Sequence, residues 1–174
     1  MSQDHQDAGT YCPSSVPDPG EAEATVLGVV GGTPERPTLV YLSDPVPVTP
    51  ELLATLGEVP AADALRIAAP CRESACSHFR DAQCSLITKI VRALPEAEPD
   101  ASVPACHLRD KCRWWQQEKV AACRRCPVIT TDQVYATELQ WWIANPANSA
   151  TDFDPRDFDP GDFVAAGADP DHGG

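Results

Sequence analysis

The sequence predicts a small, irregular α+β domain, with an N-terminal β-hairpin and two to three helices clasped by metal centres, followed by a disordered acidic tail. Three observations lead to this prediction. The 174 residues are the size of one domain. The chain has 18 prolines and 10 glycines beside a hydrophobic content of 43%, so a modest core must coexist with much irregular backbone. It also has eight cysteines, which can hold such a chain together through metal.

The hairpin is predicted from two β-branched, apolar runs at residues 25–30 and 38–42, which a turn rich in glycine and proline separates. The glycines around this turn lack the spacing of a nucleotide-binding loop and are interpreted as turn residues. A short helix is expected after Thr49, the N-cap, with Pro50 at its first position. Residues 65–69 are expected to form a third strand.

Apolar residues at helical spacing predict a helix after Cys84 that ends at Pro95 and packs on the hairpin. No proline or glycine occurs over residues 110–125, so an unbroken second helix is expected over residues 111–125. A last helix is expected over residues 131–144, anchored by a pair of tryptophans. The earlier pair, Trp114 and Trp115, is interpreted as core in preference to a shield for a metal cluster.

The predicted domain organisation has three parts. Residues 1–9 are expected to be a disordered N-terminus, residues 10–144 a cysteine-rich metal-binding domain, and residues 145–174 an acidic disordered tail. The tail contains a degenerate Asp-Phe-Asp-Pro repeat over residues 152–163, which we expect to bury too little apolar surface to offset its ordering entropy.

Charge and hydropathy restrict the function. The net charge is −13, which argues against nucleic acid or an anionic membrane as partner and favours a partner protein with a basic surface. Residues 71–126 alone have a positive balance, with ten basic and seven acidic side chains. The sequence shows neither a membrane-spanning run nor a signal peptide, so a cytoplasmic protein is expected.

The cysteines are the informative feature, because thiols in a reducing cytosol point to metal ligation or thiol chemistry. One CxxC pair, irregular wider spacings and an excess of sulfur over nitrogen favour iron-sulfur ligation over zinc. The alternative is a zinc-stabilised protein-interaction module, and buried free thiols without metal are a third possibility. The candidate ligands are Cys12, Cys71, Cys76, Cys84, Cys106, Cys112, Cys123 and Cys126.

The expected long helix also predicts how many centres there are. Cys112 and Cys123 would lie about 16 Å apart along its axis, which is too far for one four-iron cluster. Cys112 and the pair Cys123/Cys126 are therefore expected in different centres, and eight cysteines suffice for two [4Fe-4S] clusters. This condition allows ten divisions of the ligands into two fours.

Nothing in the sequence supports a catalytic site. The acidic and hydroxyl side chains form no recognisable triad or carboxylate pair, so no catalytic residue is named and the chain is not expected to be an enzyme by itself. The leading expectation is electron transfer or redox sensing. A cluster-bearing regulator that binds DNA is disfavoured by the acidic flanks.

Several short motifs, most specifically Cys112-Arg113-Trp114-Trp115-Gln116-Gln117-Glu118 with Ala122-Cys123-Arg124-Arg125-Cys126-Pro127, resemble a family of small bacterial cysteine-rich proteins loosely labelled as nitrogen fixation proteins. The resemblance covers residues 11–131. It implies that the cysteines act as one unit that binds iron-sulfur clusters, and it implies no reaction. Where members of that family read Gln-Glu-Gly, this chain has Lys119 in place of glycine, which favours the unbroken helix.

Overall fold

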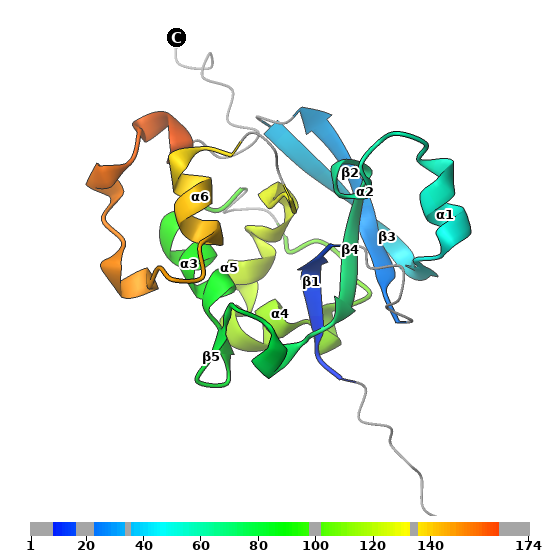
Figure 1. Cartoon of the computed structure of the whole chain (residues 1–174), viewed down its shortest axis with the longest axis horizontal. Helices are drawn as coiled ribbons and strands as arrows, with labels where there is room; N and C mark the ends of the chain where they lie inside the picture. The colour runs from blue at the N-terminus through cyan, green and yellow to red at the C-terminus, as the bar shows by residue number, and fades with distance from the viewer. Residues whose placement is uncertain (1–8, 17–22, 34–35, 98–101, 133–135, 164–174) are drawn as a thin grey trace, which may run out of the picture.

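In the computed structural model, a four-stranded antiparallel sheet lies beside six short helices, so the α+β class is confirmed (Figure 1). The structure describes residues 9–16, 23–33, 36–97, 102–132 and 136–163. The predicted disordered N-terminus, residues 1–9, lies outside this part except for Gly9. The strands are β1 (Tyr11–Ser15), β2 (Thr25–Thr33), β3 (Arg36–Pro47) and β4 (Leu65–Pro70), with β5 (Phe79–Arg80) and β6 (Gln83–Cys84) forming a separate hairpin.

The sheet order is β1-β4-β2-β3, and every pairing is antiparallel. The predicted hairpin is confirmed as β2 and β3, and the predicted third strand as β4. One glycine of the hairpin, Gly28, is not a turn residue, since it lies within β2 at a shift of register. A Cβ atom there would lie 2.6 Å from the carbonyl oxygen of Val40, so glycine permits the close approach of the two strands.

Strand β1 is the element that the sequence analysis missed. Its five residues contain a proline and show no long apolar run. It pairs with β4 at the edge of the sheet, where a proline is tolerated. This pairing brings the beginning of the chain next to residues about sixty positions further on.

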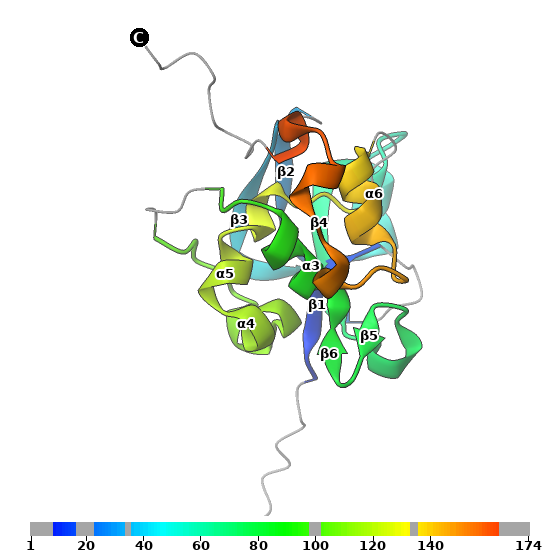
Figure 2. The same ribbon diagram turned by 90° about the vertical axis from the view of Figure 1, so that its left-hand side faces the viewer.

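The helices that follow residue 84 gather on one side of the sheet, as two views at right angles show, whereas the helix over residues 50–55 lies on the other side (Figures 1 and 2). Helix α3 (Ser85–Ala93) confirms the helix predicted after Cys84, but it packs chiefly against its helical neighbours, whereas packing on the hairpin was expected. Its Ile87 and Ile90 share the main core cluster with Leu27 of β2 and with Trp114. The helices are α1 (Pro50–Thr55), α2 (Ala61–Ala64), α3 (Ser85–Ala93), α4 (Arg113–Glu118), α5 (Val120–Cys123) and α6 (Glu138–Ala144).

Two helix predictions need correction. The helix expected over residues 111–125 is broken at Lys119, whose φ of 53° and ψ of −130° separate α4 from α5. A positive φ usually requires glycine, so neither composition nor propensity indicates this break. The last helix begins at Glu138 rather than near residue 131, because Thr137 and Gln140 form a capping box there.

The disordered tail expected from residue 145 is a third correction. Three one-turn helices, η4 (Ala150–Asp152), η5 (Pro155–Asp157) and η6 (Pro160–Phe163), extend the ordered chain to Phe163. The repeat turns each phenylalanine inward, so that Phe153 lies 5.2 Å from Trp142 and 5.7 Å from Phe158 between ring centroids. The phenylalanines thus add to the core, while Asp152, Asp157 and Asp159 are exposed. Residues 164–174 lie outside the described part.

Candidate metal centres: two sets of four cysteines

The eight cysteines are all free thiols, and they line two cavities in two sets of four. The first cysteine set is Cys12, Cys71, Cys76 and Cys84, around a cavity of about 320 Å³. The second cysteine set is Cys106, Cys112, Cys123 and Cys126, around a cavity of about 20 Å³. Neither lining contains a cysteine of the other set. Every cysteine that the sequence analysis named as a candidate ligand therefore belongs to one of the two sets.

In the first set, sheet pairing joins residues that are distant in the sequence. Cys12 on β1 pairs with Ala69 on β4. Beyond the end of β4, the N–H of Cys71 donates to the carbonyl oxygen of Thr10 at 2.7 Å. Cys12 and Cys71 thus lie close together although 59 positions separate them. Strand β1 thus closes the long gap in the sequence between Cys12 and the other cysteines.

The β5–β6 hairpin brings the other two members of the first set together. Asp81 and Ala82 both have positive φ, as a tight hairpin turn of the primed type requires. The turn pairs Phe79 with Cys84, and the N–H of Phe79 donates to the carbonyl oxygen of Cys76 at 3.0 Å. Cys76 and Cys84 consequently reach the same cavity as β1 and β4.

The second set depends on the helix break. Cys112 is the N-cap of α4, and Cys123 ends α5. Because the chain turns at Lys119, α5 does not continue the axis of α4, and the CxxC pair comes back to the cavity that Cys112 lines. The separation of Cys112 from the CxxC that the sequence predicts is therefore not found, since all three thiols line one cavity. The eight cysteines still form two groups of four, but this grouping is not among the ten that the predicted unbroken helix allowed.

The electrostatic neighbours of the thiols follow the same grouping as the cavities. Each thiol whose pKa is raised by nearby thiols is affected only by members of its own set. Cys71 and Cys84 act on Cys12, and Cys76 and Cys71 act on Cys84. The thiols that act on Cys106, Cys112 and Cys123 all belong to the second set.

Burial disfavours the thiolate form at both sets. It raises the pKa of Cys112 to about 12 and is the largest cause of the raised pKa values of Cys12, Cys84, Cys106 and Cys123. Backbone N–H groups two and three residues further along the chain lower the pKa values of Cys84, Cys106 and Cys112. These N–H groups are therefore directed at sulfur, which suits thiolates that ligate metal.

Arg66 connects the second set to the core. This residue of β4 is 2% exposed, and its guanidinium donates from Nε to the carbonyl oxygen of Pro13 at 2.7 Å and from Nη1 to that of Ile129. Its Nη2 lies 3.9 Å from Sγ of Cys126. A buried positive charge therefore stands beside the sulfur of Cys126.

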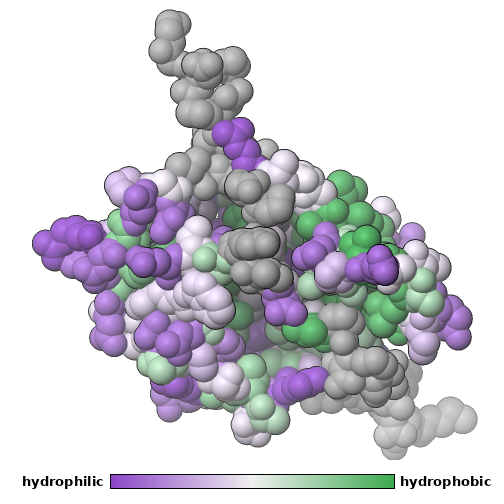
Figure 3. Space-filling model, turned by 45° about the horizontal axis from the view of Figure 1, so that its top comes forward, coloured by the Kyte–Doolittle hydropathy of each residue, from purple (hydrophilic) through white to green (hydrophobic). Residues whose placement is uncertain are grey.

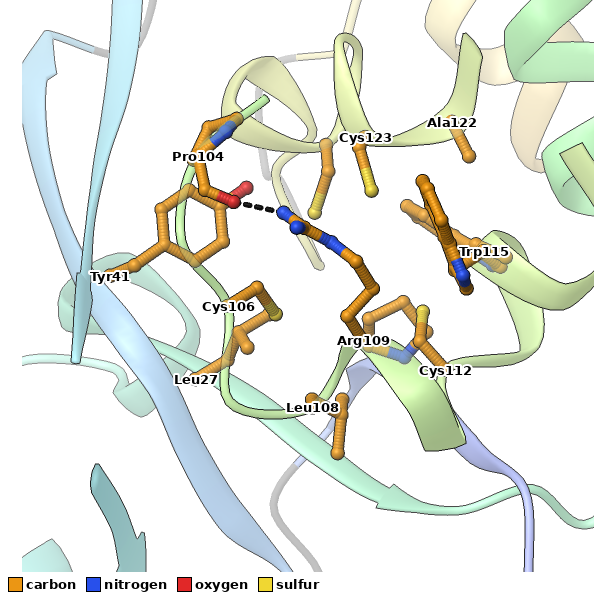
Figure 4. A pocket seen from close by; sticks show the side chains of 13 residues that line it. Leu27, Tyr41, Pro104, Cys106, Leu108, Arg109, Cys112, Trp115, Ala122 and Cys123 are labelled. Carbon is orange, nitrogen blue, oxygen red and sulfur yellow. Dashed lines mark hydrogen bonds between the residues drawn. The ribbon is translucent and has the colours of Figure 1, made fainter. Parts of the chain in front are cut away.

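A second arginine crosses the cavity of the second set. Figure 4 shows the Arg109 side chain among Cys106, Cys112 and Cys123, with its terminus donating to the carbonyl oxygen of Pro104. Its guanidinium lies 5.3 Å from the centroid of the Trp115 ring, and a hydrogen bond from this side chain lowers the pKa of Cys123. The Arg109 side chain fills space among the thiols of the second set, whereas the corresponding space in the first set is open and forms the larger cavity.

The sequence analysis missed both arginines. Arg66 stands in an apolar strand outside the cysteine-rich segment, and its only signal is a lone charge within the run Leu65–Pro70. The two histidines closest to the cysteines in sequence contribute to neither set. Nε2 of His107 is 3.3 Å from the carbonyl oxygen of Val26, and His78 lines a separate cavity between α3 and α6.

The chain has no match among protein-family models, curated proteins or solved structures. The resemblance to the cysteine-rich family thus stays a prediction. Among the described residues, no helix is long and apolar enough to cross a membrane. Within the same ranges, no group of three or more His, Cys, Asp or Glu side chains has an arrangement that could hold a metal ion.

Proposed function

We propose that the protein carries two four-iron iron-sulfur clusters, one in each cysteine set, and that it acts in electron transfer or redox sensing. The observation that carries this proposal is the division of the eight thiols into two sets of four, one complete ligand set for each cluster. The electrostatic neighbours of the thiols agree with the cavity linings on this division.

The dimensions of the first cavity favour a cluster over a single ion. A zinc ion draws four sulfurs to within about 2.3 Å of one point, and within the described residues no three cysteine side chains converge in this way. The first set, together with ten other residues, lines a cavity of about 320 Å³, which leaves room for a cluster. All four lining ligands are sulfur, which suits iron-sulfur chemistry. The zinc-stabilised interaction module remains the alternative that metal analysis must separate.

The second set fits a cluster on one condition. Its four cysteines converge on an apolar space, but Arg109 crosses it and only about 20 Å³ stays open. A cluster there requires the Arg109 side chain to rotate away from the centre. With Arg66 already beside Cys126, the second set keeps a positive charge to offset the thiolates after that rotation.

The surface supports a partner of opposite charge. Asp152, Asp157 and Asp159 are exposed on the packed C-terminal segment, and Figure 3 shows hydrophilic residues along the side of the molecule where that segment lies. The net charge of −13 extends this character to the whole chain. We propose a redox partner protein with a basic surface, because opposite charges speed association at low salt.

Anaerobic reconstitution tests the proposal. Wild-type protein should reach about eight iron and eight sulfide per chain. Cys76→Ala and Cys123→Ala form a matched pair, one from each set, and each should keep about four iron in the intact set. Ser77→Ala, beside the first cavity but without a thiol, should bind as wild type does. Colourless protein that holds zinc and no iron would contradict the proposal and support the interaction module.

A further inference from the structure

Trp114 is the residue that the linings of the two cavities share. It lies in the first turn of α4, directly after Cys112 and Arg113. Its side chain is 1% exposed and is the largest among the fully buried side chains of the described part. The indole therefore forms a wall between the first and second cysteine sets, and it excludes water from the space between them.

Arg66 fixes the position of this ring. The Cζ atom of Arg66 lies 5.7 Å from the centroid of Trp114, and the same guanidinium lies beside Sγ of Cys126. A cation over the face of an indole is attracted to it, and it also makes removal of an electron from the ring harder. Trp114 is thus suited to stay unoxidised while it stands between two redox groups.

The indole N–H of Trp114 has no acceptor. Nε1 is buried, and within the described residues no acceptor lies at hydrogen-bonding distance. A buried donor without a partner costs free energy, and buried tryptophans ordinarily satisfy this group. The residue that separates the two sulfur-lined cavities therefore carries a spare donor, and sulfur atoms of clusters are acceptors that tune reduction potential.

We infer that Trp114 is the positioning residue that links the two centres, a shared wall through which one electron passes and whose N–H donates to a sulfur atom of a bound cluster. The inference rests on the proposed function. In the transfer, the centre of one set loses one electron and the centre of the other gains it. An external one-electron donor protein supplies the electron, no atom moves, and the indole is not oxidised.

Indole NMR of the anaerobically loaded, ¹⁵N-tryptophan-labelled wild-type chain tests the placement without altering the wall. The chain has four tryptophans, so Trp141 and Trp142 of α6 are internal controls. The Trp114 N–H signal should be shifted or broadened by the paramagnetic centre in Cys76→Ala, which keeps the second set, and also in Cys123→Ala, which keeps the first. The Trp115 signal should respond only where the second set is loaded, since Trp115 lines that cavity alone.

The variant Trp114→Phe, with Trp115→Phe as its matched control, tests the link. Trp114→Phe should keep its iron and sulfide, lower the reduction potential of the centre that has lost the N–H, and slow electron exchange between the two centres. Trp115→Phe should affect only the second centre. A Trp114 signal that responds to one set alone, or unchanged potentials and exchange in a loaded Trp114→Phe, would overturn the inference. Failure of the wild-type chain to bind iron would instead overturn the proposed function.

Discussion

The two cysteine sets contain the same number of thiols, but they differ in how they are built and in what lies between the sulfurs. The first set is assembled at the edge of the sheet by β1 and by a small hairpin, and it surrounds about 320 Å³ of open space. The second set is folded into the core, where Arg109 and an apolar wall leave about 20 Å³. The thiols of the two sets therefore differ in solvent access, in the polarity of their surroundings and in how far they depend on the core. A cluster bound in the first set should accordingly differ from one in the second set in its assembly and its exposure.

The largest difference should appear when the buried arginine of the second set is removed. Arg66→Met leaves the carbonyl oxygens of Pro13 and Ile129 without their donor, and we expect a loss of about 3–5 kcal/mol in the free energy of unfolding. Arg113→Met is the matched change at the first set, where the partner Glu73 is 56% exposed, and it should cost about 1 kcal/mol. Urea unfolding followed by circular dichroism measures both values, and equal losses would contradict the contrast.

Thiol labelling should separate the two sets next. Cys112 and Cys126 are 8% exposed, and burial raises the pKa of Cys112 to about 12, so little of the reactive thiolate is present at neutral pH. In metal-free protein we expect alkylation of Cys112 to be at least about tenfold slower than that of Cys76. Mass spectrometry of timed samples measures the rates. The rate at Cys112 should rise with pH up to about 12, and a plateau near pH 9 would contradict its raised pKa.

A smaller effect concerns α3, whose N-cap is Cys84 of the first set. Lys89 is fully buried, donates to the carbonyl oxygen of Asn145 at 2.6 Å, and has its pKa lowered to about 8 by burial. Since its ordinary value is 10.5, the unfolded chain binds more protons between these values, and stability from this group must rise with pH.

The measurement compares wild type with Lys89→Met at several pH values, so that other titrations cancel. The difference in unfolding free energy should move in favour of wild type by about 2 kcal/mol between pH 7 and pH 10. A difference that stays flat, or that moves against wild type, would show that the pKa of Lys89 is not lowered in the folded chain.

The smallest effect concerns the break that forms the second set. Lys119 has a φ of 53°, so Lys119→Gly should relieve backbone strain and stabilise the chain by about 1 kcal/mol. Lys111→Gly, at the end of η2 (Arg109–Lys111), is the control, because Lys111 is not among the residues with positive φ. Thermal unfolding should show a higher midpoint for the first variant and a lower one for the second. A lower midpoint for Lys119→Gly would mean that α4 and α5 are continuous.

Local patterns in the sequence predicted the hairpin, β4, the cap at Thr49 and the amphipathic α3, because each follows from neighbouring residues. The eight thiols could likewise be recognised by composition. What failed depends on long-range contacts. The pairing of β1 with β4, the positive φ of Lys119 and the packing of Phe153 on Trp142 are fixed by tertiary structure.

The candidate site shows the same limit. The argument that placed Cys112 apart from the CxxC assumed an unbroken helix, and one residue in an unusual conformation reversed it. Arg66 lies in a strand and Arg109 in the one-turn helix η2, and no spacing rule assigns either of them to a set of thiols. The identity of the candidate ligands was therefore predictable, whereas their grouping was not.

The iron content of two double variants tests the grouping most directly. Cys76→Ala/Cys84→Ala removes two ligands of the first set, and Cys76→Ala/Cys123→Ala removes one ligand from each set. After anaerobic reconstitution, the first variant should keep about four iron per chain and the second close to none. If the first variant loses all its iron while the second keeps four, the eight cysteines do not form the two sets described above.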